Sequence, residues 1–570
     1  MYYLLEKKAL SIRAGRFTVV RSILFWTGII MVSSMVLVMS ASTSYGAAVA
    51  NSPAKHSSIP GSALVPLGHG PIRLPYGASV VGALPPSTTI HLVVSLAPRS
   101  PNSLSRFVQE VSTPGSPEYR HYLTAHQFVV RFGQPARAVD AVVKELRSQG
   151  IDPGQPSKNH LSIPVTATVS EASRALHVKF DLVRLRSGRM ARFATSHPEI
   201  PYAISSVVQG VMGLSTVNTP LPQSFTISGK VVPSDTSNLP TVAQEPAQVR
   251  YAAPNSFTTV TAPPSACSAA SSTRGYTPQL LSEGYDLGPV YSSGGDGAGQ
   301  TVGLVELGAF SSSDIATYEK CYGISTTVNT IPVDGGGSFN SNTNEATSDV
   351  ENVVGMVPDA TVDVYVAPDT GTGYYDVIQA AVNADKAQVI SISYGNCEQV
   401  VGSAQAQAEE TLFEQAASQG QTVLAAAGDT GSAGCYIAGA SNPDTSLAVN
   451  DPASDPYVTG VGGTDLSSLS SPRTETVWNN HNGEGGGGGI STFWPMPSWQ
   501  SAPGVVNKYS SSIPCGASSG YCREVPDVSA NASVGYPMYC TAGVCNNTGW
   551  ELIAGTSMAT PLWASIITMS

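Results

Sequence analysis

The stretch GTSMATP at residues 555–561 lies near the end of the 570-residue chain. A serine in a Gly-Thr-Ser turn that opens a helix presents its hydroxyl and its backbone N–H at the positive end of the helix dipole. That placement suits a nucleophile and a developing oxyanion, although for an isolated Gly-Thr-Ser a simple N-cap serine is the favoured interpretation. The full seven residues favour Ser557 as a catalytic nucleophile.

Short apolar strands alternate with helices upstream of this stretch. We expect strands at 301–307, 360–366, 389–393 and 422–427, and helices at 312–322, 375–385 and 404–418. This order predicts an α/β fold, with a parallel sheet and helices on both of its faces. Catalytic side chains in such sheets gather just after the carboxyl ends of the strands.

A serine nucleophile needs a base, and histidine is scarce in this half of the chain. Eight of the nine histidines lie at or before His197, so only His481 remains. It sits in a polar stretch that leads into the glycine run at 485–489, which predicts an exposed, flexible loop. A carboxylate must therefore activate Ser557.

Glu345 and Asp349 can supply that carboxylate. They are four residues apart and share one face if the segment is helical. Two adjacent carboxylates repel when both are ionised, so one pKa rises and a proton can be shared. We expect Glu345 to take the proton of Ser557 and Asp349 to hold Glu345. Two surface acids near the start of a helix are the alternative interpretation.

Asp429 is the third candidate, because it follows the strand at 422–427 and stands in the turn Gly428-Asp429-Thr430-Gly431. A protonated aspartic acid at the end of the sheet could donate a hydrogen bond to the oxyanion, alongside the N–H of Ser557. A purely turn-forming aspartate is the alternative.

The preceding segment, residues 60–222, predicts a smaller α/β domain with a ferredoxin-like arrangement. Expected strands lie at 89–97, 160–169 and 179–185, and expected helices at 101–111, 135–149 and 170–177. Residues 51–222 carry a net charge of +8 and residues 223–570 carry −23. Opposite charges of this size favour docking of the two segments.

The remaining segments indicate export. Residues 1–50 combine five basic residues with an apolar run and small residues, as in a signal peptide, with an uncleaved signal anchor as the alternative. All eight cysteines lie between 267 and 545, an even number that favours disulfides. Cys515–Cys522 and Cys540–Cys545 are natural pairs, and Cys397–Cys435 is a further candidate. Residues 223–266 are a polar linker, open to proteolytic processing.

Composition excludes two classes of protein. The net charge of −11 argues against a nucleic-acid binder that works through a basic surface. No stretch after the first fifty residues is apolar for long enough to span a membrane, which argues against a polytopic membrane protein.

Motifs in both halves together resemble the sedolisin family, the serine-carboxyl peptidases of family S53. The first half resembles a pro-kumamolisin activation domain at LPPST (84–88), SPEYRHYLT (116–124), QF (127–128) and RFG (131–133). The second half matches at YTP (276–278), SISYG (391–395), VGGT (461–464), STF (491–493), PSWQ (497–500) and PDVS (526–529). The resemblance implies a subtilisin-like peptidase domain at 267–570.

The resemblance also implies residue roles. Ser557 would be the nucleophile, Glu345 the base, Asp349 its partner and Asp429 the oxyanion acid. Ser393 and Gly395 resemble the edge segment that holds an extended substrate. Glu306 resembles a secondary acidic group near the site, and a structural role suits it equally well.

Family members carry calcium in a segment well after the serine. Residues 558–570 contain no Asp or Glu, so we expect no metal ligand in this chain and a peptidase domain truncated at its C-terminus.

The implied function is a secreted, extracellular, acid-active endopeptidase made as a zymogen. It would hydrolyse protein or peptide substrates through an acyl-enzyme, act as a monomer and be inhibited by its own propeptide. We expect no nucleic-acid partner, and no membrane association after signal removal. An inactive, secreted binding or structural protein on the same fold is the alternative. A His-dependent subtilisin is a weaker alternative.

The histidine alternative makes a simple prediction. Replacing His481 with alanine should leave proteolysis of a denatured protein substrate unchanged, because a carboxylate rather than an imidazole serves as base. Loss of activity in this variant would revive the His-dependent alternative.

Overall fold

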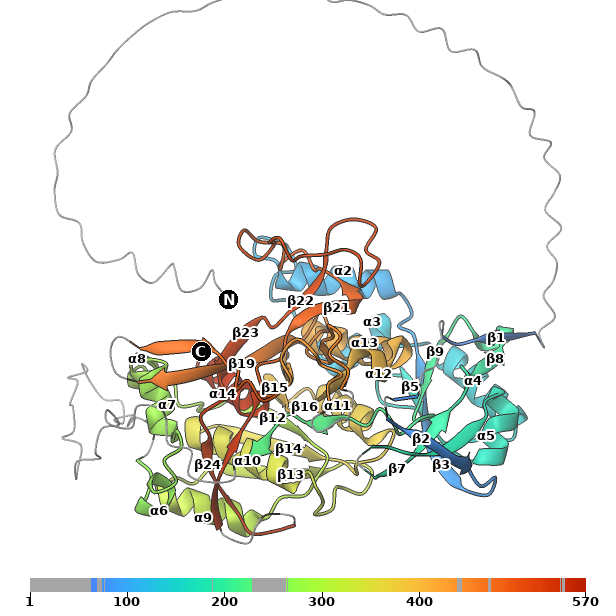
Figure 1. Cartoon of the computed structure of the whole chain (residues 1–570). Helices are drawn as coiled ribbons and strands as arrows, with labels where there is room; N and C mark the ends of the chain where they lie inside the picture. Colours follow the sequence, from blue (N-terminus) through green and yellow to red (C-terminus); the bar gives the residue numbers. More distant parts are fainter. Residues whose placement is uncertain are drawn as a thin grey trace, which may run out of the picture. The chain divides into compact units, whose positions relative to one another are not determined.

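The peptidase half is built around an eight-stranded, mostly parallel sheet (Figure 1). Its strand order is β13-β14-β12-β15-β17-β19-β20, with β23 also paired to β19, and only β20 runs antiparallel to its neighbour. The strands are β12 (Thr301–Glu306), β13 (Thr327–Pro332), β14 (Thr361–Val366), β15 (Val389–Ile392), β17 (Thr422–Ala426), β19 (Thr459–Ser468), β20 (Thr474–Val477) and β23 (Val528–Asn531).

This computed structural model describes residues 63–68, 74–75, 77–186, 188–227, 263, 265–437, 443–469, 473–543, 545 and 549–570. The predicted signal segment at 1–50 and most of the linker at 223–266 lie outside the described residues.

Helices cover both faces of the sheet, as the strand–helix alternation predicts. Alternate strand residues point to opposite sides, so Val302 and Leu304 enter one core while Val305 enters the other. The first core packs against α9 (Ser312–Tyr322), α10 (Thr343–Met356) and α14 (Thr556–Thr568); the second packs against α11 (Gly373–Ala384) and α13 (Ser403–Gln419). The predicted α/β fold is confirmed.

Shorter elements complete this half and form the rim of the sheet. The helices are α6 (Ser268–Ser271), α7 (Pro278–Gly284), α8 (Gly288–Ser292) and α12 (Glu398–Val401). The strands are β16 (Tyr394–Cys397), β18 (Asn450–Asp451), β21 (Gly489–Pro495), β22 (Cys522–Val525), β24 (Tyr536–Cys540) and β25 (Gly549–Ala554).

The activation segment has its own four-stranded antiparallel sheet, in the order β4-β5-β3-β9. This order matches the split βαβ arrangement of a ferredoxin-like domain. The elements are β3 (Thr89–Leu96), α2 (Pro101–Ser112), α3 (Ala125–Phe132), α4 (Ala136–Ser148), β4 (Asp152–Pro153), β5 (Ser162–Thr168), α5 (Val169–Leu176) and β9 (Val208–Met212). Beside them lie β1 (Leu64–Pro66) with β8 (Glu199–Pro201), and β2 (Ser79–Ala83) with β6 (Phe180–Arg184) and β7 (Met190–Ala194).

The activation domain packs on α11 and α13 mainly through neutral side chains. Asn159 donates to Gln415 at 2.9 Å, and Ser162 donates to Gln379 at 3.1 Å. Further hydrogen bonds cross from Gln209 to the Gln407 carbonyl and from Asn218 to Gln405. Charges also interact across this interface. Burial raises the pKa of Asp369 in the peptidase half, and the positive charge of Arg189 in the activation domain partly opposes that rise.

Four disulfides join the cysteines of the peptidase half: Cys267–Cys321, Cys397–Cys435, Cys515–Cys522 and Cys540–Cys545. The three pairs considered from the sequence are confirmed. The fourth disulfide, Cys267–Cys321, joins residues that are 54 positions apart, and a separation of this size does not predict a pairing from the sequence. Within the described part of the chain, every helix falls short of the length and apolarity that a membrane crossing needs.

The Asn159–Gln415 contact should stabilise the docked chain independently of salt. Replacing Asn159 with leucine strands a buried amide oxygen of Gln415 and should lower the free energy of unfolding by about 1–3 kcal/mol. Chemical denaturation of an uncleavable Ser557→Ala protein measures this. Exposed Asn102→Ala is the matched control, expected within about 0.5 kcal/mol of the parent. A loss that disappears in high salt would contradict the neutral interface.

Candidate active site

Ser557 is the second residue of α14, and the turn before the helix fixes the position of its backbone. Gly555 precedes the helix with φ +131°, a conformation that favours glycine. The Ser557 N–H donates to the Gln223 carbonyl at 3.0 Å. Its Oγ is fully buried and has no partner of standard hydrogen-bond geometry, yet it lies close enough to Glu345 to lower the pKa of that carboxyl. The hydroxyl is therefore available to a carboxylate base.

Glu345 and Asp349 lie one turn apart on α10, and both are fully buried. Burial raises the pKa of Glu345 well above its usual range, and the charge of Asp349 raises it further. A hydrogen bond from Ser224 and the nearby Ser557 hydroxyl oppose this rise. Burial likewise raises the pKa of Asp349, with the charge of Glu306 adding to it. These carboxyls therefore share protons rather than ionise together.

Glu306 extends this carboxyl cluster at the end of β12. Its Oε2 accepts a hydrogen bond from the Tyr394 hydroxyl at 3.0 Å. Burial raises the pKa of Glu306, and the charge of Glu345 adds to the rise. Glu306 therefore lies near enough to Glu345 and Asp349 for their charges to interact.

Asp429 follows β17, and its side chain binds the first residue of α14. Its Oδ1 accepts from the backbone N–H and from the hydroxyl of Thr556, both at 2.8 Å. Its Oδ2 borders Gly555, where an added Cβ would lie 2.6 Å away. Burial raises the pKa of Asp429 to about 7, although the side chain keeps some exposure to solvent. With Oδ1 holding two donors, a proton belongs on Oδ2, which faces the turn before Ser557.

The proposed substrate edge also lies at Ser557. Ser393 follows β15, and its Oγ donates to the Ser557 carbonyl at 3.2 Å. The Ser393 carbonyl accepts the Gln223 N–H at 3.0 Å. Gly395 on β16 pairs with Leu221 of β10 (Leu221–Pro222), so this edge already holds an extended strand.

His481 takes no part in this arrangement. Its side chain is exposed, and its backbone N–H is held by Asn479 in a local turn. The titratable group that the Ser557 hydroxyl reaches is the carboxyl of Glu345.

Sequence reasoning missed three contributors to the site. Thr556 supplies both hydrogen bonds to Asp429, Tyr394 donates to Glu306, and Ser224 donates to Glu345. Thr556 lies inside the quoted motif and could have been assigned as a partner of a neighbouring acid. Ser224 lies in the polar linker, where no sequence signal sets it apart.

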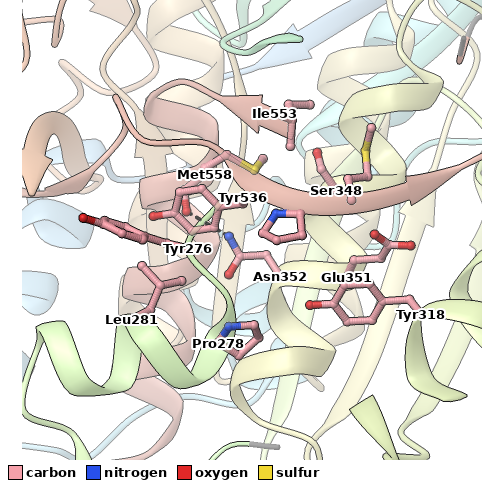
Figure 2. A pocket seen from close by; sticks show the side chains of 12 residues that line it. Tyr276, Pro278, Leu281, Tyr318, Ser348, Glu351, Asn352, Tyr536, Ile553 and Met558 are labelled. Atoms are coloured by element: carbon pink, nitrogen blue, oxygen red, sulfur yellow. Dashed lines mark hydrogen bonds between the residues drawn. The ribbon is translucent and has the colours of Figure 1, made fainter. Parts of the chain in front are cut away.

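A small cavity lies beside the site rather than in it (Figure 2). None of the four proposed catalytic residues lines it. Glu351 and Asn352 of α10 reach its wall, where Glu351 accepts the Tyr539 N–H at 2.8 Å and Asn352 donates to the Met558 carbonyl at 3.0 Å. These contacts hold α10 against β24 and α14, so the cavity belongs to the core that positions Glu345 and Ser557.

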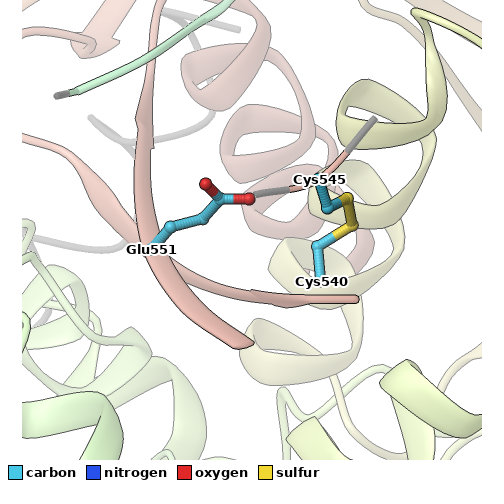
Figure 3. Close-up of side chains that lie close together, drawn as sticks. All are labelled: Cys540, Cys545 and Glu551. Atoms are coloured by element: carbon cyan, nitrogen blue, oxygen red, sulfur yellow. A yellow bond between two sulfur atoms is a disulfide. The ribbon is translucent and has the colours of Figure 1, made fainter. Parts of the chain in front are cut away.

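The described residues offer one group with metal-ligand types, namely Cys540, Cys545 and Glu551 (Figure 3). Both cysteines are bound in a disulfide, which removes their thiolates as ligands. Calcium requires several oxygen ligands, so this group does not suit the ion that the family resemblance implies.

Comparison with known proteins covers both halves of the chain. The Pro-kumamolisin activation domain family matches residues 76–217, and the Subtilase family matches residues 336–569. Kumamolisin of Bacillus sp. (strain MN-32) is 35% identical over 305 residues, which cover 51% of this chain and 51% of kumamolisin. Sedolisin of Pseudomonas sp. (strain 101) is 29% identical over 503 residues, which cover 84% of this chain and 75% of sedolisin. The chain thus combines a Pro-kumamolisin activation domain with a subtilase-type peptidase domain, and its relatives include kumamolisin and sedolisin.

Other sedolisin-family relatives include tripeptidyl-peptidase 1 of Mus musculus, 27% identical over 87% of this chain and 81% of that protein. The solved structure of Pseudomonas sedolisin, a serine-carboxyl proteinase, aligns with a TM-score of 0.42 and 28% identity over 52% of this chain and 80% of that chain. The present chain spans about half the length of kumamolisin.

The buried carboxyls should make this fold more stable in acid. Glu306, Glu345 and Asp349 hold protons in the folded state that the unfolded chain loses near pH 4. Stability is therefore full below about pH 4 and falls as pH rises, by up to about 1.4 kcal/mol per pH unit for each group.

Thermal unfolding of the Ser557→Ala protein between pH 4 and pH 7 tests this expectation. The melting temperature should fall across the range, and adding Glu345→Gln should reduce the fall. A melting temperature that rises towards neutral pH would contradict the raised pKa values.

Proposed function

We propose that this chain is an exported, acid-active serine-carboxyl endopeptidase made as a zymogen. The observation that carries the proposal is that the Ser557 hydroxyl, at the start of a helix, lies beside the Glu345 carboxyl, whereas His481 is exposed in a local turn. The named peptidases among its relatives support the same chemistry. Every group invoked comes from one chain, so we propose that a monomer is sufficient.

Acylation would begin when Glu345 takes the proton from Ser557 Oγ as the oxygen attacks a substrate carbonyl carbon. Asp349 would hold Glu345 in place and share its charge. Collapse of the tetrahedral intermediate breaks the C–N bond, and the leaving amine takes the proton from Glu345. Water, activated by the same carboxylate, then hydrolyses the ester and restores Ser557.

Oxyanion stabilisation would come from the Ser557 N–H and a protonated Asp429. The carboxylic acid can donate from Oδ2 because Oδ1 is held by Thr556. A donor at this position acts on charge that develops only in the transition state. Activity then requires an ionised Glu345 together with a protonated Asp429. Because the pKa of Asp429 is raised to about 7, we place the optimum on the acid side of that value.

Protein or peptide chains would be the substrates, and the activation domain would act as an intramolecular inhibitor. Its docking on α11 and α13 supports this role. The signal-like segment at 1–50 supports export and an extracellular location. The group of metal-ligand types found among the described residues contains a disulfide and does not suit calcium, so no catalytic step here involves that ion.

Loss-of-function variants test the triad. With a denatured protein substrate at pH 4, Ser557→Ala should lower the rate roughly 10⁴–10⁶-fold. Glu345→Gln should lower it roughly 10²–10⁴-fold, since an amide cannot accept the proton. A wild-type protein that folds but cuts nothing between pH 2 and pH 8 would instead favour an inactive binding protein.

The pH profile tests the role of Asp429. Wild-type activity should fall as pH rises through about 7, where Asp429 loses its proton. Asp429→Asn keeps the acceptor for Thr556 and a donor at every pH, so the alkaline limb should move to higher pH. An unchanged limb in Asp429→Asn, measured as kcat/KM on one peptide, would assign that limb to another group.

A further inference from the structure

The end of the activation segment passes through the active site as an extended strand. β10 (Leu221–Pro222) pairs antiparallel with β16, and β11 (Phe225–Thr226) pairs antiparallel with β25. The chain is thus held by main-chain pairing on both sides of residues 223–224. This is the way in which an extended peptide is bound by strand addition.

The backbone of Gln223 makes the contacts expected of a residue whose carbonyl is attacked. Its N–H donates to the Ser393 carbonyl and its carbonyl accepts the Ser557 N–H, each at 3.0 Å. The carbonyl oxygen therefore already occupies the position where an oxyanion would be stabilised.

Ser224, the next residue, brings the Gln223–Ser224 peptide bond close to the carboxyls of Glu345 and Asp429. The Ser224 hydroxyl donates to Glu345 Oε2. A Cβ added to Gly555 would clash with the Gln223 carbonyl oxygen, and it would lie 2.8 Å from Ser224 Cα and 2.6 Å from Asp429 Oδ2. The Gln223–Ser224 bond therefore lies against Gly555, and the Asp429 carboxyl contacts the same glycine.

We infer that Gln223–Ser224 is the first bond that this protein cuts, in its own chain. The inference rests on the proposed peptidase function and adds the bond and its recognition. Ser557 Oγ bonds to the Gln223 carbonyl carbon, the bond to the Ser224 nitrogen breaks, and Glu345 returns the proton to that nitrogen. Water then releases Gln223 as a free carboxylate, which leaves Ser224 as the new N-terminus.

Side chains of the same segment indicate which peptides the site accepts. The Gln223 amide donates to the Gly395 carbonyl at 3.2 Å and accepts from Asn450 at 3.4 Å. Phe225 stacks on the buried Trp478 with ring centroids 5.7 Å apart. The site therefore suits peptides with glutamine before the cut and an aromatic residue two positions after it.

The experiment follows the full-length protein as it is shifted from neutral pH to pH 4. Intact mass and N-terminal sequencing identify the first product at early times, over a tenfold range of protein concentration. We expect a fragment that begins Ser-Phe-Thr, formed at a rate independent of concentration because the reaction is intramolecular. Ser557→Ala should remain uncut.

A matched pair of variants isolates the backbone contact. Gln223→Ala keeps the N–H that binds Ser393 and loses only the amide contacts, so the first cut should stay at the same bond and slow less than in Gln223→Pro. Gln223→Pro removes that N–H and should slow this cut by about 10²-fold or more. A synthetic peptide with the sequence LPQSFT should also be cut after glutamine by the processed enzyme, and a peptide with the same residues in scrambled order should not.

Two outcomes separate the inference from the proposed function. If the processed enzyme digests denatured protein but the first cut lies elsewhere, for instance within 228–275, the inference is wrong and the proposed function stands. If neither the chain itself nor denatured protein is cut, both fail.

Discussion

Burial of several carboxyl groups around one serine is the constraint on which the site depends. Glu306, Glu345 and Asp349 lie in a low-dielectric core where three separate charges would be too costly. The cluster must therefore hold protons that exposed carboxyls would release. Hydroxyls of Ser224, Ser393 and Tyr394 lower the pKa values of these carboxyls, but burial still raises them well above their usual range. Acid conditions suit such a site, because they stabilise the buried cluster and keep Asp429 protonated.

The fold brings these groups together from distant parts of the sequence. The carboxyl ends of β12, β15 and β17 place Glu306, Ser393 and Asp429 along one edge of the sheet. Helices α10 and α14 pack on one face and bring Glu345 to Ser557. The strand at 221–222 then adds to β16, which places the chain's own peptide across the assembled site. The strand ends of the large sheet thus position the catalytic groups, and β16, which follows β15 in the chain, positions the segment that they face.

Much of this arrangement could be predicted from the sequence, because it depends on local patterns. Helical spacing places Glu345 and Asp349 on one face, and the rule for strand ends points to Asp429. Long-range contacts could not be predicted in the same way. Net charge correctly predicted docking of the two halves, yet neutral pairs such as Asn159–Gln415 supply many of its contacts. Nothing in the local sequence of Gln223 indicates that it would pair with residues 170 or more positions away.

Labelling of the serine tests the central claim most directly. A fluorophosphonate reacts only with an activated hydroxyl, and peptide mass spectrometry locates the adduct. At pH 4, the account predicts that wild-type protein is labelled on Ser557, and that Glu345→Gln, which removes the base but keeps the shape, is not. Equal labelling of Ser557 in both proteins, or labelling that is lost only when His481 is replaced, would contradict activation by carboxyls.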